Sequence, residues 1–167
     1  MSKVAIVTDS TSYIPHDMLA QHNISVAPQV IIWGEETLRD DIDIRPAEFY
    51  RRLKNARQMP TTSQVTIAAF VEIFERLQQQ DYQILAVLIS EKLSGTIDSA
   101  RQARQMLPDA SIEIFDSFST AMALGFQTLA VARAAADGAT MAQCLALAEK
   151  SRQNSGVLFM VDTLEFL

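Results

Sequence analysis

Residues 82–96 read YQILAVLISEKLSGT and contain the stretch that decides the fold. The run from Tyr82 to Ile89 is almost wholly apolar, which predicts a strand buried on both faces. Ser94-Gly95-Thr96 follows shortly after and leads into apolar residues at helical spacing. A buried strand, a polar turn and then an amphipathic helix is the order expected in a parallel α/β sheet.

The same alternation extends in both directions from this stretch. Besides residues 82–89, strands are predicted at 4–7, 24–27, 29–33, 111–115 and 157–161. Helices are predicted at 15–21, 46–53, 67–77, 97–107, 120–136 and 140–153. Residues 61–64 are expected to form a polar connection. The order predicts an α/β fold, a mostly parallel sheet with helices on both faces.

Composition restricts the function further. The chain has 167 residues, 49% of them hydrophobic, which suits one globular domain of ordinary size. A net charge of −6 disfavours nucleic acid, because phosphate binding usually needs a basic face. A single cysteine rules out an internal disulfide, and no apolar run is long enough for a membrane span or a signal peptide. We therefore expect a cytoplasmic protein.

Small hydroxyl residues recur where strands of the predicted sheet end. They occur in Asp9-Ser10-Thr11-Ser12, in Ser94-Gly95-Thr96 and in Asp116-Ser117-Phe118-Ser119, and residues 61–64 have the same character. Open parallel sheets bind ligands at this edge. Gly95 and the helix start after it suit an anionic head group, either carboxylate or phosphate. The alternative is that these hydroxyls only cap helices and turns.

No residue pattern indicates catalysis, a metal or a cofactor. Asp40, Asp41 and Asp43 are expected in a solvated loop, and His16 and His22 on the surface. Cys144 falls on an apolar stripe and is expected in the core. The chain has no Walker A, GxGxxG or HExxH motif and no nucleophile elbow.

Several motifs, taken together and in order, resemble the DegV family of bacterial fatty-acid-binding proteins. They are VTDST at 7–11, RDDIDI at 39–44, PTTSQ at 60–64, KLSGT at 92–96, DS at 116–117 and VDTL at 161–164. The pair formed by PTTSQ and LSGT at this separation is specific, although each alone is weak. The resemblance extends over essentially the whole chain.

The resemblance implies a lipid carrier and not an enzyme. Family members hold a long-chain fatty acid with its tail in an apolar tunnel, and some present it to a fatty acid kinase that makes acyl phosphate for phospholipid synthesis. Carried over by motif, Thr62 and Ser94 bind the carboxylate, with Thr61 and Ser63 beside Thr62. Gly95 and Thr96 shape the same turn, and Asp9 and Ser10 lie on the crevice rim.

The resemblance also implies a division of the chain. Residues 1–161 are expected to form the α/β ligand-binding domain, and residues 162–167 to begin the connection to a second domain absent from this chain. An exposed interdomain face could drive self-association. Two other classes stay open: an enzyme domain that binds a phosphorylated ligand at residues 94–96, with Lys92 as its only nearby cation, and a purely structural domain.

Overall fold

A four-stranded parallel sheet forms the centre of the molecule. The computed structural model describes residues 3–158 and 160. Its main sheet has the order β2 (Ser25–Ala27), β1 (Val4–Asp9), β6 (Gln83–Leu88) and β7 (Ile112–Asp116), and all three pairings are parallel. β1 is buried throughout and β6 almost so, as their continuous apolar runs predict. The predicted fold class is confirmed.

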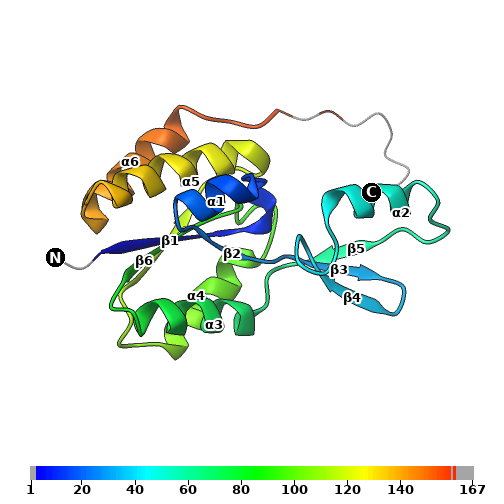
Figure 1. The fold of residues 1–167 in the computed structure, drawn as a ribbon, viewed down its shortest axis with the longest axis horizontal. Coiled ribbons are helices and arrows are strands. Elements are labelled where there is room, and N and C mark those ends of the chain that lie inside the picture. The colour runs from blue at the N-terminus through cyan, green and yellow to red at the C-terminus, as the bar shows by residue number, and fades with distance from the viewer. Residues whose placement is uncertain (1–2, 159, 161–167) are drawn as a thin grey trace.

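Helices cover both faces of this sheet (Figure 1). One face packs against α3 (Ile67–Gln78) and α4 (Thr96–Met106). The other packs against α1 (His16–Gln21), α5 (Ala121–Ala136) and α6 (Met141–Gln153). Alternate residues of β6 enter the two cores: Ile84, Ala86 and Leu88 face α3 and α4, whereas Leu85 and Val87 face α5 and α6. Residues 10–12 form a single 3-10 turn, η1 (Ser10–Ser12).

A second, smaller unit projects from the sheet, and we call residues 30–63 the lobe. It contains β3 (Val30–Trp33), β4 (Glu36–Arg39), α2 (Pro46–Leu53) and β5 (Thr61–Ser63), with β3 between β4 and β5 in an antiparallel sheet. Figure 1 shows it at the right, beyond the end of the main sheet. Its own core contains Ile31, Trp33 and Ile44 with Phe49 packed against them. The two strands β4 and β5, and the second sheet that they form with β3, were not predicted from the sequence.

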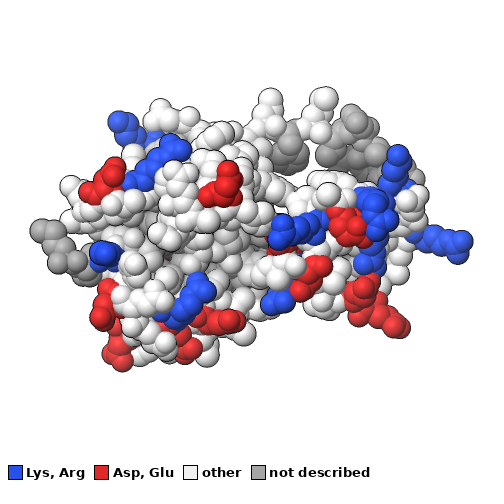
Figure 2. Space-filling model, viewed as in Figure 1, with Lys and Arg blue, Asp and Glu red and all other residues white. Residues whose placement is uncertain are grey.

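Three arginines on the lobe are paired with carboxylates. Arg39 pairs with Asp43, Arg51 with Glu48, and Arg52 with Glu36. On the face drawn in Figure 2, basic and acidic side chains accordingly lie next to one another over the lobe. The charges of these three arginines are therefore balanced locally.

The end of the described chain differs from the prediction. A buried strand was expected at 157–161, but Val157, Leu158 and Met160 are outside any strand, and their exposed fractions are 42%, 100% and 88%. Residues 159 and 161, and the expected connection at 162–167, lie outside the described residues. Val157 and Leu158 do not pair with β2, β1, β6 or β7, the strands of the main sheet.

Candidate functional site: a cleft between the sheet edge and the lobe

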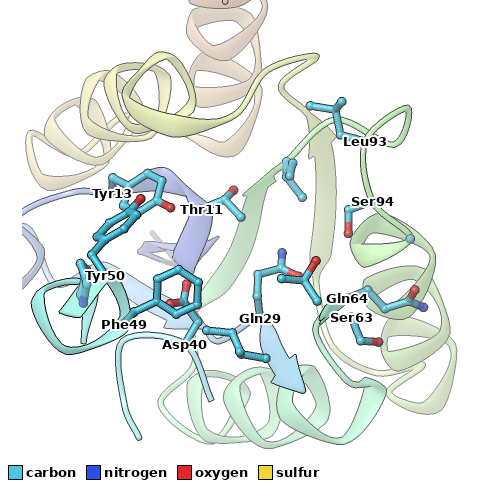
Figure 3. A pocket seen from close by; sticks show the side chains of 15 residues that line it. Thr11, Tyr13, Gln29, Asp40, Phe49, Tyr50, Ser63, Gln64, Leu93 and Ser94 are labelled. Carbon is cyan, nitrogen blue, oxygen red and sulfur yellow. The ribbon is translucent and has the colours of Figure 1, made fainter. Parts of the chain in front are cut away.

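A cleft of about 460 Å³ lies between the carboxyl ends of the main strands and the lobe (Figure 3). The main body contributes the segments after β1, β2 and β6, and the lobe contributes β3, β5 and α2. The lining residues are Thr11, Tyr13, Gln29, Ile31, Asp40, Pro46, Phe49, Tyr50, Thr62, Ser63, Gln64, Ile89, Leu93, Ser94 and Gly95. The cleft therefore occupies the edge at which the sequence predicted a ligand.

Strand β5 places one of its two threonines on the cleft. Thr62 pairs with Ile31 across the antiparallel ladder, and both line the cleft. Thr61 pairs with Ile32 instead, and neither of these lines it. Successive side chains of a strand point to opposite faces, so Thr61 faces away from Thr62. The predicted pair of threonines is thus divided by the strand, and only Thr62 and Ser63 line the cleft.

The turn before α4 forms the opposite wall. Ser94 is half-buried and Gly95 directly precedes the helix. A Cβ at Gly95 would lie 2.5 Å from Gln64 Oε1, so glycine is what allows the Gln64 amide to pack against this turn. Gln64 Nε2 also donates to Ser99 Oγ at 3.3 Å. The turn and the segment after β5 are therefore fitted to each other.

Thr96 is fully buried below this turn and does not line the cleft. Its hydroxyl lies 2.9 Å from Ser94 Oγ and accepts from Gln29 Nε2 at 3.0 Å. Its backbone N–H donates to Ser94 Oγ at 3.3 Å. Thr96 therefore supports Ser94 from beneath.

Asp9 and Ser10 were expected on the crevice rim, but the structure places both beneath the cleft. Asp9 has no exposed surface, because it ends a strand that is paired on both sides. Its Oδ1 accepts from the Thr11 N–H at 3.0 Å and the Thr11 hydroxyl at 2.6 Å, and its Oδ2 accepts from the Ile89 N–H at 2.8 Å. Burial raises the pKa of Asp9, and these hydrogen bonds oppose that rise. Ser10 is also buried, and its Oγ accepts from the Gln29 N–H at 3.1 Å.

Apolar and aromatic side chains form the side of the cleft contributed by the lobe and by the segment after β1. Ile31, Phe49 and Tyr50 come from the lobe, and Tyr13 from the segment after β1. Figure 3 shows Tyr13 and Tyr50 on the side opposite Ser94. The cleft is thus lined by small hydroxyl residues at one end and mainly by aromatic and aliphatic side chains at the other.

Asp40 is the only charged residue among the described residues that line the cleft. Burial raises its pKa, and a hydrogen bond from Ser10 opposes that rise. Its neighbour Asp43 is exposed, and hydrogen bonds from Arg39 lower the pKa of Asp43 to about 2. His16 Nε2 lies 3.2 Å from Asp41 Oδ2. Within residues 3–158 and 160, no group of three His, Cys, Asp or Glu side chains is placed to bind a metal ion.

Gln29, Asp40 and the aromatic wall were not predicted from the sequence. Gln29 could have been found, because it stands two residues after the end of β2, at the edge where the other strand ends carry candidate ligands. Asp40 and Phe49 reach the cleft only because the lobe folds back over the sheet edge, and no local pattern indicates that. Cys144 is buried in the core, as predicted.

Together, the open parallel sheet and the cleft at its carboxyl edge define an α/β domain with a candidate ligand site at the usual position for this class of fold. The chain belongs to the DegV family: residues 3–167 match the family model described as "Uncharacterised protein, DegV family". Protein DegV of Bacillus subtilis is 34% identical over 165 residues, which are 98% of this chain and 59% of that protein. The predicted family membership is confirmed.

Solved structures show the same relationship. The structure described as DegV, a fatty acid binding protein from Bacillus subtilis, aligns with a TM-score of 0.86 and 32% identity over 92% of this chain and 55% of that one. A DegV family protein from Thermus thermophilus, described by its fatty acid binding, aligns with a TM-score of 0.82 and 28% identity over 90% of this chain and 54% of that one. This chain spans about three fifths of the length of its curated relatives. None of the described helices is long and apolar enough to cross a membrane.

Proposed function

We propose that this chain binds a long-chain fatty acid in the cleft, with the carboxylate at Thr62 and Ser94 and the acyl chain along the apolar wall. One observation supports this most strongly: hydroxyl groups line one end of the cleft, mainly aromatic and aliphatic side chains line the other with Asp40 as its one charged group, and no lysine or arginine is among the described lining residues (Figure 3). Such a site matches a molecule with a small polar head and a long apolar tail. The fatty-acid binding described for structural relatives agrees with it.

The same observation weighs against the alternative, an enzyme domain for a phosphorylated ligand. A phosphate dianion is usually bound by lysine, arginine or a metal as well as by neutral donors. Lys92, the cation that this reading needs, does not line the cleft, and its Nζ lies 5.8 Å from the centre of the Phe118 ring. Neutral hydroxyl donors are sufficient for the single charge of a carboxylate.

In the proposed site, Ser63 and Gly95 shape the walls beside the two ligand hydroxyls, while Thr96, Asp9 and Ser10 support them from below. Thr61 faces away and would contribute only through its strand pairing. The exposed apolar mouth includes Tyr13, Tyr50 and Leu93, whose exposed fractions are 55%, 63% and 55%. In a longer protein a second domain would cover this mouth and complete the tunnel, and in its absence the mouth would favour self-association.

We further propose that the domain is a carrier, which presents the acid to a fatty acid kinase and performs no reaction itself. Each methylene group buried in the tunnel contributes about 0.8 kcal/mol, so a missing tunnel wall would cost several kcal/mol of affinity. The chain of 167 residues is therefore expected to bind more weakly than a two-domain version. A cytoplasmic location remains a prediction.

The test is a titration of a long-chain fatty acid into the 167-residue chain and into a two-domain version completed from the Bacillus subtilis relative. Ser94→Ala and Thr62→Val should each weaken binding about 10- to 150-fold, the usual value of a hydrogen bond to a charged group. Thr61→Val is the matched control, because it makes the same change on the opposite face of β5. Absence of binding by both unaltered proteins, or equal losses for Thr61→Val and Thr62→Val, would contradict the proposal.

A further inference from the structure

Gln29 connects the cleft to the buried carboxylate of Asp9. It is 8% exposed, and its Nε2 lies 3.0 Å from Thr96 Oγ1 and 3.4 Å from Asp9 Oδ1. Thr96 Oγ1 in turn lies 2.9 Å from Ser94 Oγ. A hydrogen-bonded chain therefore runs from beneath the sheet edge to the wall of the cleft, through Asp9, Gln29, Thr96 and Ser94.

Asp9 fixes the direction of the first hydrogen bond in this hydrogen-bonded chain. Both of its oxygens accept from backbone N–H groups, Oδ1 from Thr11 and Oδ2 from Ile89, and a backbone N–H can only donate. Oδ1 also accepts from the Thr11 hydroxyl at 2.6 Å, so Asp9 presents acceptors to Gln29, and the amide nitrogen faces it at the longer distance of 3.4 Å. The NH₂ group has two hydrogens, one for Asp9 and one for Thr96.

The hydrogen bond between Thr96 and Ser94 then has a fixed direction as well. A threonine hydroxyl has two lone pairs and one hydrogen. On Thr96 the lone pairs are occupied by Gln29 Nε2 at 3.0 Å and by the Val65 N–H at 3.4 Å. Thr96 must therefore donate its hydrogen, and Ser94 Oγ at 2.9 Å is a closer acceptor than Gln29 Oε1 at 3.4 Å. Ser94 accepts this hydrogen, and its own remains available to the cleft.

We propose that Gln29, held by Asp9, is a positioning residue that makes Ser94 a hydrogen-bond donor toward the cleft. This rests on the proposed function and extends it to specificity: the site selects an ionised carboxylate, which accepts, over a neutral alcohol of equal length, which can also donate. Neither Asp9 nor Thr96 needs to touch the ligand for this selection to operate.

Gln29→Glu should reverse the direction of the hydrogen bonds from residue 29 through Thr96 to Ser94, with almost no change in the shape of the side chain. The new carboxyl group has at most one hydrogen, and the Asp9 carboxylate is the strongest acceptor for it. With that hydrogen used for Asp9, none is left for Thr96, so the carboxyl oxygens facing Thr96 can only accept from it, whether the group is ionised or protonated. Ser94 must then turn its hydrogen inward to Thr96 and present lone pairs to the cleft.

The measured quantity is the ratio of affinities for dodecanoic acid and 1-dodecanol, obtained by displacement of a fluorescent fatty-acid analogue. We use the 167-residue chain and the two-domain version, with Gln29→Glu, Ser94→Ala and the double variant in each. Gln29→Glu should lower the acid-to-alcohol ratio about tenfold or more, as expected for a lost hydrogen bond to a charged group. In the Ser94→Ala background the same substitution should change the ratio less than about twofold, because the effect passes through Ser94.

Gln29→Met provides a second measurement if Gln29→Glu does not fold. It frees one lone pair of Thr96 without adding charge, so Ser94 can turn either way and the ratio should fall about two- to fivefold. Thr128→Val, a buried hydroxyl loss on α5, controls for general destabilisation and should leave the ratio unchanged.

The outcomes separate the two proposals. Dodecanoic acid binding by the unaltered protein with an unchanged ratio in the Gln29 variants would overturn the positioning role alone. A drop in ratio that persists in the Ser94→Ala background would assign the effect to the added charge and would also overturn it. If the unaltered chain and the two-domain version bind neither compound, the proposed function fails and this inference fails with it.

Discussion

Gly95→Ala should weaken ligand binding without unfolding the protein. The new Cβ would lie 2.5 Å from Gln64 Oε1 and 2.9 Å from Gln64 Cδ, well inside ordinary van der Waals contact. The obstructing group is the end of a flexible side chain, so Gln64 can turn away. It would then give up its hydrogen bond to Ser99 Oγ. Because Gln64 lines the cleft, this movement changes the wall beside Ser94.

The effects on stability nearly cancel. Gly95 has φ −72° and ψ 7°, which alanine also adopts, so the less flexible unfolded chain adds about 0.4–1 kcal/mol to the free energy of unfolding. The lost hydrogen bond removes about 0.5–1.5 kcal/mol. The Tm should therefore stay within about 4 °C of the unaltered protein. Crowding of the cleft is expected to cost about 1–3 kcal/mol of binding free energy, or roughly 5- to 150-fold in affinity.

Thermal unfolding and titration with dodecanoic acid measure the two effects separately. The control is the double variant Gly95→Ala/Gln64→Ala, which removes the side chain that the new methyl group displaces. It should recover most of the lost affinity. Binding by Gly95→Ala as tight as that of the unaltered protein, or binding by the double variant as weak as that of the single one, would refute a role for Gln64 displacement.

Two further predictions concern charge and packing. Burial raises the pKa of Asp40, so the folded state holds its proton more tightly than the unfolded chain. Ionised Asp40 therefore lowers the stability of the folded state at neutral pH. This destabilisation disappears as the pH falls below the ordinary pKa of an aspartate. Asp40→Asn should be more stable than the unaltered protein at pH 7, by a margin that shrinks on acidification. The pKa of Asp43 is lowered to about 2, so Asp43→Asn should lower the free energy of unfolding at pH 7, opposite to Asp40→Asn. Urea titrations at several pH values measure both changes. A change of the same sign for both variants at pH 7 would contradict these predictions. The Phe74 ring is fully buried and stacks on Phe70, with the ring centres 5.4 Å apart. Phe74→Ala should therefore lower the free energy of unfolding by about 3–5 kcal/mol. Phe126 is 64% exposed, so Phe126→Ala should change that free energy by less than about 0.5 kcal/mol.

The main sheet could be predicted from the sequence because each of its strands carries its own signal. Residues 82–89 are apolar almost without interruption, and a strand of that kind must be covered on both faces. Helix starts were predictable for the same reason. Thr140 and Gln143 form the capping box that their spacing predicts, with Thr140 N donating to Gln143 Oε1 at 2.8 Å.

The lobe could not be predicted in the same way, since its strands are defined by their partners. Residues 61–63 are exposed hydroxyl residues, and they form a strand because β3 offers them an edge. β4 had a usable signal: Gly34, with φ 65°, and Glu35 form a two-residue turn between paired Trp33 and Glu36, the mark of a hairpin. The side of the cleft formed by the carboxyl edge of the main sheet was predictable from the sequence. The opposite side, formed by the lobe, was not.

The head-group contacts of the proposed site differ from those of a charged clamp. An arginine fork would hold a carboxylate by two charge-assisted bonds, and release would require breaking both. In the proposed site Thr62 and Ser94 offer one neutral donor each, so most of the binding free energy comes from the buried acyl chain. The head group then contributes orientation and selectivity for the ionised acid more than affinity. Without a salt bridge at the head group, release of the acid would require breaking only hydrogen bonds to neutral donors.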